Sequence, residues 1–296
     1  SLEFTSQSGL ITKGDLIVTS TSSPGWGLMQ EMLSHISWCE LPCVVINVQR
    51  GGPGQGTTRH AQTDYLSVTR GGYGGYKSIV LAPASVQECH DLMQLALYLA
   101  DKYRILVVVL CDGILIRITE LVESKAMDFG PLPPKDWALK GTAKKGGRFD
   151  LVHSTRGLML DSYKSLKEAL HEKYHQIADC GVRYQSLEAD DAELLLVAYG
   201  YVARCCKGAV SMARSQGLKL GLLRPITLWP FPYEIIRQKA GQGCRFLVVE
   251  DSMGQMIEDV KLGAEGKAES YLLGLSARHQ GGELGMLFPE SILEEA

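Results

Sequence analysis

Arg50 ends a short apolar segment and stands directly before a glycine-rich stretch that contains Gly51, Gly52 and Gly54. A guanidinium binds a carboxylate through two parallel N–H donors, and neighbouring glycines leave room for a planar ligand. Parallel α/β sheets bind ligands at the carboxyl ends of their strands. These residues therefore predict an anion-binding loop. An ion pair between Arg50 and Asp64 is the alternative interpretation, and the spacing does not separate the two.

A second pattern, His171-Glu172-Lys173-Tyr174-His175, matches the H-E-x-x-H pattern of helical zinc peptidases. There, two histidines bind zinc and the glutamate acts as the base. The surrounding helix is rich in Lys and Glu and borders a linker, which is typical of a solvated helix. A zinc hydrolase that uses His171, Glu172 and His175 is therefore an alternative that its context disfavours.

The segment Cys111-Asp112-Gly113 resembles the Gly-Asp-Gly motif that binds diphosphate and magnesium in thiamine enzymes. That motif needs a downstream Asn, whereas the only Asn of this chain, Asn47, lies upstream. The chain is therefore predicted to hold no metal site of this kind, and Asp112 is interpreted as a turn residue at a strand end.

The eight cysteines never form a C-x-x-C pair, so the sequence predicts neither a zinc site nor an iron–sulfur cluster in this chain. They are interpreted as buried thiols in a reducing compartment. Any redox centre is then expected on a partner.

Strand and helix signals alternate along the chain, which indicates parallel α/β architecture. Strands are expected at 15–20, 43–48, 78–82, 105–111, 194–199, 219–223, 246–250 and 271–275. Helices are expected at 28–38, 85–102, 162–178, 200–217, 233–240 and 255–265. The first unit spans residues 1–123, a linker with a connecting helix spans 124–189, and the second unit spans 190–296.

Composition excludes several classes of function. The 296 residues carry 30 basic and 33 acidic side chains, a formal net charge of −3, which gives no footprint for nucleic acid or an anionic membrane. The longest apolar runs fall far short of the ~18 residues of a membrane helix, and no secretory signal opens the chain. A cytoplasmic protein is expected.

Several sequence blocks in order resemble the α subunit of 2-oxoacid:ferredoxin oxidoreductases. The blocks are Thr21 to Gly25, Gly27 to Glu31, Leu41 to Gly54, Ala82 to Glu88, Asp112-Gly113, Leu222 to Pro232 and Val249 to Gln255. The subgroup acting on branched-chain 2-oxoacids such as 2-ketoisovalerate, or on 2-oxoglutarate, is the most similar.

The resemblance implies a thiamine-diphosphate-binding (pyrimidine-type) domain at 1–123, shortened at its N-terminus, and a transketolase C-terminal-like domain at 190–296. It implies oxidative decarboxylation of a 2-oxoacid to acyl-CoA and CO₂, with electrons passed to ferredoxin. Arg50 would bind the substrate carboxylate, and Gly25, Gly51, Gly52 and Gly54 would lie in loops beside the cofactor.

The resemblance also implies a division of labour between subunits. A β subunit would carry the diphosphate and Mg²⁺, and iron–sulfur clusters would lie on a partner chain or on ferredoxin. The family's N-terminal segment, with the Glu that bonds the pyrimidine ring, does not precede Asp15. No catalytic residue is therefore assigned to this chain, and the isolated chain is expected to be inactive. A non-catalytic assembly subunit is the alternative.

Overall fold

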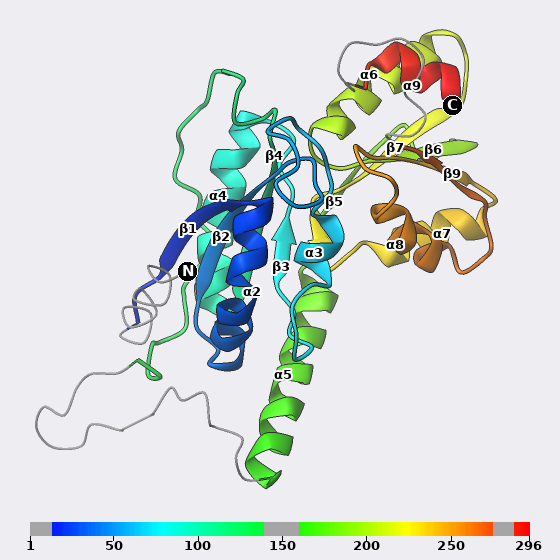
Figure 1. The fold of residues 1–296 in the computed structure, drawn as a ribbon. Helices are drawn as coiled ribbons and strands as arrows, with labels where there is room; N and C mark the ends of the chain where they lie inside the picture. The colour runs from blue at the N-terminus through cyan, green and yellow to red at the C-terminus, as the bar shows by residue number, and fades with distance from the viewer. Residues whose placement is uncertain (1–13, 139–159, 275–286) are drawn as a thin grey trace, which may run out of the picture.

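The computed structural model describes residues 14–138, 160–274 and 287–296 (Figure 1). They form two five-stranded sheets with helices on both faces. The predicted α/β class is confirmed, and each predicted strand is found with its ends shifted by a few residues. The predicted linker falls partly on 139–159, which lie outside the described residues.

The first sheet has the strand order β1-β2-β4-β3-β8. Its strands are β1 (Ile17–Ser22), β2 (Cys43–Gln49), β4 (Leu106–Asp112), β3 (Ile79–Leu81) and β8 (Thr227–Trp229). The first four are parallel, whereas β8 runs antiparallel to β3. β8 was not predicted, because its three residues precede the proline-rich Pro230 to Pro232, which is typical of a turn.

Helices cover both faces of this sheet, as the continuous apolar strands predict. Helix α2 (Ser23–Trp38) packs on the face that carries Val45, and α4 (Val86–Tyr103) packs on the face that carries Val44. Helix α2 begins five residues earlier than predicted, because Pro24 fits the first turn of a helix.

The second sheet has the strand order β10-β9-β6-β7-β5. Its strands are β10 (Ser270–Leu273), β9 (Arg245–Val249), β6 (Leu194–Val197), β7 (Leu220–Pro225) and β5 (Tyr184–Leu187). β5 is an antiparallel edge strand. The expectation of two parallel sheets therefore needs one correction, because each sheet ends in an antiparallel strand. β5 was missed because its side chains are exposed and show no burial pattern.

The remaining helices complete the layers (Figure 1). They are α3 (Tyr65–Thr69), α5 (Leu160–Cys180), α6 (Gly200–Ser215), α7 (Tyr233–Gly241), α8 (Met256–Ala264) and α9 (Pro289–Glu295). Helices α6 and α9 pack on one face of the second sheet, and α7 and α8 pack on the other. No helix among the described residues is long and apolar enough to cross a bilayer.

The two sheets share one hydrophobic core. A single cluster of buried side chains runs from α2 and the first sheet through Tyr65 and Tyr199 to α7, α8 and the second sheet. All eight cysteines are free thiols, and Cys180 is exposed, contrary to the expectation of burial.

A buried ion pair also links the two halves. Arg224 on β7 is completely buried and contacts the carboxylate of Glu88 on α4, with Nη1 2.7 Å from Oε1. Glu88 further accepts the N–H of Ala84 at 2.8 Å. Burial raises the pKa of Glu88, but the hydrogen bond and charge of Arg224 outweigh burial and hold that pKa below its ordinary value.

We expect Glu88→Gln to lower the free energy of unfolding by about 3 kcal/mol, because the buried guanidinium of Arg224 would lose its counter-charge. Urea unfolding of the purified chain measures this. The matched control is Glu234→Gln, which breaks the surface pair with Arg237 and should cost less than ~1 kcal/mol. Equal losses of unfolding free energy in both variants would show that the buried pair stabilises the fold no more than the surface pair does.

Candidate functional site

A crevice of about 480 Å³ opens where β1, β2 and β4 end, at the carboxyl edge of the first sheet. Its lining residues are Ser20, Thr21, Ser22, Val48, Gln49, Arg50, Thr58, Gly113, Ile116 and Arg117. Two of these residues are cationic and none is acidic. The crevice therefore has the charge of an anion site, at the edge where parallel sheets bind ligands.

The backbone of Arg50 is fixed by hydroxyl groups on both sides. Its N–H donates to Ser23 Oγ at 3.1 Å, and its carbonyl accepts the hydroxyl of Thr63 at 2.7 Å. Its guanidinium makes no hydrogen bond or ion pair with the described residues, and Nε is buried without a partner. A fixed backbone with an unpartnered cationic head is the arrangement expected of a residue that receives an anion.

The alternative interpretation, an Arg50–Asp64 ion pair, is not what the structure shows. The Asp64 carboxylate instead accepts Ser23 Oγ at 2.6 Å and Asn47 Nδ2 at 3.0 Å. Burial raises the pKa of Asp64, and these two hydrogen bonds and the charge of Arg50 oppose the rise. Asp64 therefore has no direct bond to Arg50. It holds the Ser23 hydroxyl that accepts the Arg50 N–H, and its charge interacts with that of Arg50.

The four predicted glycines divide into two kinds. A Cβ on Gly25 would lie 2.1 Å from Thr21 Oγ1, and a Cβ on Gly51 would lie 2.7 Å from the Thr57 side chain. Gly25 and Gly51 therefore allow close packing around the crevice. Gly52 and Gly54 are exposed. A Cβ on Gly52 would lie 4.0 Å from Thr63 Oγ1 and one on Gly54 would meet no atom of the described residues within 4 Å, so a ligand or a partner can approach this part of the loop.

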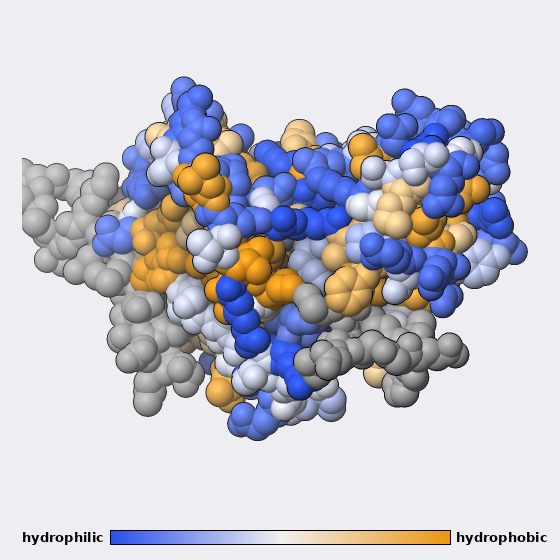
Figure 2. All heavy atoms as spheres, turned by 90° about the horizontal axis from the view of Figure 1, so that it is seen from above, coloured by the Kyte–Doolittle hydropathy of each residue, from blue (hydrophilic) through white to orange (hydrophobic). Residues whose placement is uncertain are grey.

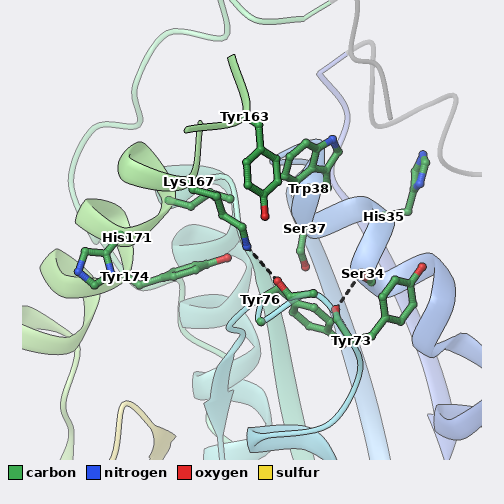
Figure 3. Close-up of a pocket in the computed structure, with 13 residues that line it drawn as sticks. Ser34, His35, Ser37, Trp38, Tyr73, Tyr76, Tyr163, Lys167, His171 and Tyr174 are labelled. Carbon is green, nitrogen blue, oxygen red and sulfur yellow. Dashed lines mark hydrogen bonds between the residues drawn. The ribbon is translucent and has the colours of Figure 1, made fainter. Parts of the chain in front are cut away.

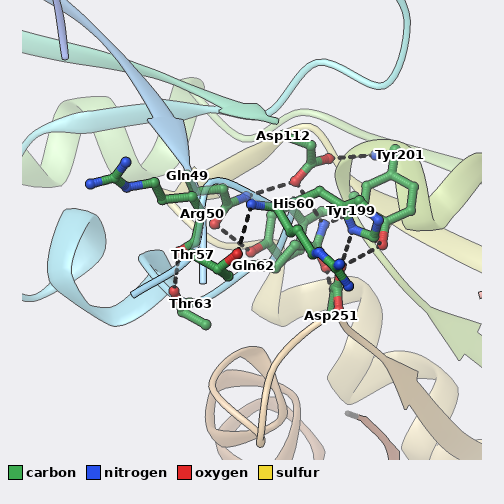
Figure 4. Close-up of polar contacts among 11 residues, drawn as sticks. Gln49, Arg50, Thr57, His60, Gln62, Thr63, Asp112, Tyr199, Tyr201 and Asp251 are labelled. Atoms are coloured by element: carbon green, nitrogen blue, oxygen red, sulfur yellow. Dashed lines mark hydrogen bonds and ion pairs between the residues drawn. The ribbon is translucent and has the colours of Figure 1, made fainter. Parts of the chain in front are cut away.

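Behind the crevice, buried and half-buried polar groups join the carboxyl edges of the two sheets (Figure 4). We call this set the polar seam; its members are Gln49, His60, Gln62, Asp112, Tyr199, Tyr201 and Asp251. Asp112 accepts Gln49 Nε2 at 2.8 Å, Gln62 Nε2 at 3.2 Å and the N–H of Tyr201 at 2.6 Å. Asp112 ends β4, and its carbonyl accepts the N–H of Leu115 at 3.0 Å, so its interpretation as a turn residue at a strand end is confirmed. Its carboxyl group in addition links the two halves of the chain.

The far end of the polar seam holds the residues that follow the glycine-rich loop. His60 Nδ1 lies 2.8 Å from Asp251 Oδ2, which also accepts the hydroxyl of Tyr201 at 2.5 Å. Gln62 exchanges two bonds with the backbone of Asp251, at 2.7 and 3.0 Å. The loop that begins at Arg50 is therefore anchored to the second sheet.

We expect the pH dependence of stability to report on Asp112. Burial raises its pKa from 3.8 to about 7, although its three hydrogen-bond donors oppose the rise. Between these two values the folded chain retains a proton that the unfolded chain has released, so stability falls as pH rises through this window, by up to about 1.4 kcal/mol per pH unit. Above about pH 7 this contribution is constant.

Urea unfolding at pH 5, 6, 7 and 8 measures this slope in the native chain and in Asp112→Asn, which cannot ionise. The comparison is between the two slopes of unfolding free energy against pH. The absolute values are not compared, because the amide in Asp112→Asn has one acceptor fewer than the carboxylate and lowers stability at every pH. Asp190→Asn, at an exposed aspartate, is the control. A slope in Asp112→Asn equal to that of the native chain would contradict the assignment.

Other cations of the sequence lie in different settings. Arg70 pairs with Glu258 at 3.0 Å and with Asp259, away from the crevice. Arg59 is exposed in the glycine-rich loop. Arg117 does line the crevice and donates to the carbonyl of Thr58 at 2.6 Å, but no sequence signal pointed to it.

The H-E-x-x-H segment lies on α5. His171 and His175 face each other, with their Nε2 atoms 3.0 Å apart, while Glu172 accepts a hydrogen bond from Gln176. Within the described part of the chain, no group of three or more His, Cys, Asp or Glu residues could hold a metal ion. The zinc-hydrolase alternative therefore finds no third ligand there.

Comparison with protein families now identifies the chain. Residues 7–177 match the family "Pyruvate flavodoxin/ferredoxin oxidoreductase, thiamine diphosphate-binding", and residues 192–287 match "Pyruvate:ferredoxin oxidoreductase core domain II". The chain belongs to the 2-oxoacid:ferredoxin oxidoreductase family. The predicted family is therefore confirmed, as is a thiamine-diphosphate-dependent class of enzyme.

Curated relatives of the family differ in the substrate that their names give. The chain is 42% identical over 258 residues to the ketoisovalerate oxidoreductase subunit VorB of Methanothermobacter marburgensis, covering 86% of this chain and 72% of that protein. It is 35% identical over 289 residues to the 2-oxoglutarate synthase subunit KorA of the same organism, covering 90% of this chain and 77% of that protein. Both relatives are named as subunits.

Solved structures confirm the fold. The 2-oxoglutarate:ferredoxin oxidoreductase from Magnetococcus marinus superposes with a TM-score of 0.78 at 24% identity, covering 97% of this chain. This chain spans about half, 54%, of the length of that solved chain. A split-gene transketolase superposes with a TM-score of 0.52 at 13% identity, covering 99% of this chain and 74% of that chain.

Proposed function

We propose that this chain is the subunit that binds the 2-oxoacid carboxylate in a ferredoxin-dependent 2-oxoacid oxidoreductase, and that Arg50 is the carboxylate ligand. The observation that supports this is the guanidinium without a protein partner at a carboxyl-edge crevice that no acid lines. A bidentate bond from Arg50 would orient the 2-oxo carbon toward the cofactor.

Thiamine diphosphate, when bound, would supply an electron sink for the carbanion left by loss of CO₂. Two electrons would then leave for ferredoxin, one at a time, and the acyl group would pass to coenzyme A. The crevice suits the substrate side of this reaction: it offers hydroxyl groups from Ser20 to Ser22, two guanidinium groups and open space at Gly52 and Gly54. It offers no carboxylate for Mg²⁺. We therefore place the diphosphate and Mg²⁺ on a β subunit, and the pyrimidine-facing role on residues 1–123.

We also assign residues 124–189 to the connection between units and residues 190–296 to a transketolase C-terminal-like domain. The polar seam would then fix the second domain against the carboxyl edge of the first. This assignment accounts for why the seam residues come from both halves of the chain.

Partner subunits are part of the proposal, because the relatives are named as subunits. Large apolar side chains stand exposed, among them Leu28 at 77%, Leu121 at 99% and Met253 at 82%. Figure 2 shows separate hydrophobic patches among hydrophilic side chains on the face seen from above. Such patches mark association surfaces. We assign them to the β subunit and to an iron–sulfur subunit or ferredoxin.

We propose a branched-chain 2-oxoacid such as 2-ketoisovalerate as the substrate, with 2-oxoglutarate as the alternative. Val48 and Ile116 give the crevice aliphatic walls, which suit a branched chain. Arg117 is the second cation there, and it already donates to Thr58. A second carboxylate on the substrate would have to displace that bond.

We expect Arg50→Ala to lower kcat/KM for the 2-oxoacid by about 10- to 150-fold in the assembled enzyme, because a charge-assisted hydrogen bond worth about 1.5–3 kcal/mol is lost. Arg50→Lys should restore part of the loss, since a point charge replaces a bidentate fork. The assay follows CoA-dependent reduction of a viologen dye with 2-ketoisovalerate and with 2-oxoglutarate.

Arg245→Ala, at an exposed arginine on β9, is the matched control and should leave kcat/KM unchanged. Native kcat/KM in Arg50→Ala would reassign Arg50 to a structural role. An assembled enzyme that turns over neither 2-oxoacid would favour the non-catalytic assembly subunit instead.

We expect the purified chain without partner subunits to show no 2-oxoacid oxidation, even with thiamine diphosphate, Mg²⁺ and coenzyme A added. The physical reason is that its crevice provides no carboxylate for Mg²⁺. Adding the partner subunits should restore turnover in the same assay. Turnover by the chain alone would refute the proposed division of labour.

A further inference from the structure

A second cavity, of about 540 Å³, lies at the other edge of the first sheet (Figure 3). Helix α2 starts where β1 ends and finishes just before β2 starts, so its last turns lie at the amino edge. The cavity is enclosed by those turns, by residues 73–76 and by one side of α5. It is therefore separate from the crevice that holds Arg50.

Five of the thirteen residues that line this cavity carry Trp or Tyr rings. The aromatic lining residues are Trp38, Tyr73, Tyr76, Tyr163 and Tyr174. The rings of Trp38 and Tyr163 lie 6.0 Å apart between centroids and are tilted by 31°. Flat, rigid walls of this kind suit a planar ring, which can stack on them at little cost in conformational entropy.

One fully charged group, Lys167, lines the cavity, and no carboxylate does. Figure 3 shows Lys167 extending from α5 toward residues 73–76, where its Nζ donates to the carbonyl of Gly74 at 3.0 Å. The same ammonium lies 6.0 Å from the centroid of the Tyr163 ring. Because the carbonyl and the ring are both neutral, no negative charge among the described lining residues balances that of Lys167. His35 and His171 add further nitrogen atoms and no negative charge.

The loop of residues 71–76 shapes this cavity. Gly72 has φ +82°, and a Cβ there would lie 2.6 Å from the ring and hydroxyl of Tyr76. Ser34 Oγ donates to the carbonyl of Tyr73 at 3.0 Å and ties the loop to α2. The Tyr76 hydroxyl donates to Gln30 Oε1 at 3.4 Å, and burial raises the pKa of Tyr76 to about 12.

We infer that this cavity is a binding site for a small planar aromatic anion. The ring would stack against Trp38 and Tyr163, and the anionic group would contact the ammonium of Lys167. The volume lies within the range of about 300–1,000 Å³ that is common for small-molecule sites. Since the cavity lies at the opposite edge from the crevice, this site is additional to the proposed substrate site.

The test uses two fluorescent probes that share their aromatic part. 8-Anilinonaphthalene-1-sulfonate is anionic, and N-phenyl-1-naphthylamine is its neutral counterpart. Both are titrated into the assembled enzyme. We expect Lys167→Met to weaken the anionic probe at least roughly tenfold, the loss of one charge-assisted contact, and to leave the neutral probe unchanged. Tyr163→Ala should weaken both probes.

The matched control is Lys164→Met on the same helix, where Lys164 is 76% exposed and pairs with Glu168. It should leave both probes unchanged. Lys167→Arg keeps the positive charge and should retain affinity for the anionic probe. This result would show that weaker binding in Lys167→Met comes from the lost charge and not from a misfolded chain.

Equal affinity of the anionic probe for the native enzyme and for Lys167→Met would overturn the inference. Binding to the isolated chain but not to the assembled enzyme would also overturn it, because a partner subunit would then fill the cavity. Neither result would affect the Arg50 assay, so failure here is distinguishable from failure of the proposed function.

Discussion

The structure depends on one buried contact, the carboxylate of Asp112 with its three N–H donors. The donors come from the end of β2, from the segment after the glycine-rich loop and from the first turn of α6. Burial costs this carboxyl group its hydration, and the three donors offset part of that cost. The contact therefore requires the two sheets to meet at their carboxyl edges, and it fixes the residues that follow Arg50 between them.

The loop that begins at Arg50 is fixed at both ends, so the positive charge of Arg50 stays at the crevice without an acid among the described residues to pair with it. Asp64, the acid that could neutralise it, is held by Ser23 and Asn47. The buried Nε of Arg50 has no partner in the described part of the chain, which is unfavourable to the fold on its own, and the proposed substrate carboxylate would supply the missing acceptor. The ammonium of Lys167 in the second cavity likewise contacts only neutral groups of the described chain, the carbonyl of Gly74 and the ring of Tyr163.

Local patterns in the sequence predicted much of this fold, because continuous apolar strands and a capping residue such as Ser85 act over a few residues. They also placed Arg50 at a strand end. Local patterns could not predict the polar seam, because His60 and Asp251 are 191 residues apart and meet only after the sheets dock. Strand β8 was missed for the same reason: its pairing with β3 is tertiary, and its sequence resembles a turn. Arg117 lay in a segment with no periodic signal.

The most direct test of the central claim is a structure of the assembled enzyme with its 2-oxoacid bound. We expect the substrate carboxylate about 2.7–2.9 Å from the guanidinium nitrogens of Arg50, in the crevice at the carboxyl edge of the first sheet. A substrate carboxylate held by another chain, with the Arg50 guanidinium closed against a protein acid, would contradict it.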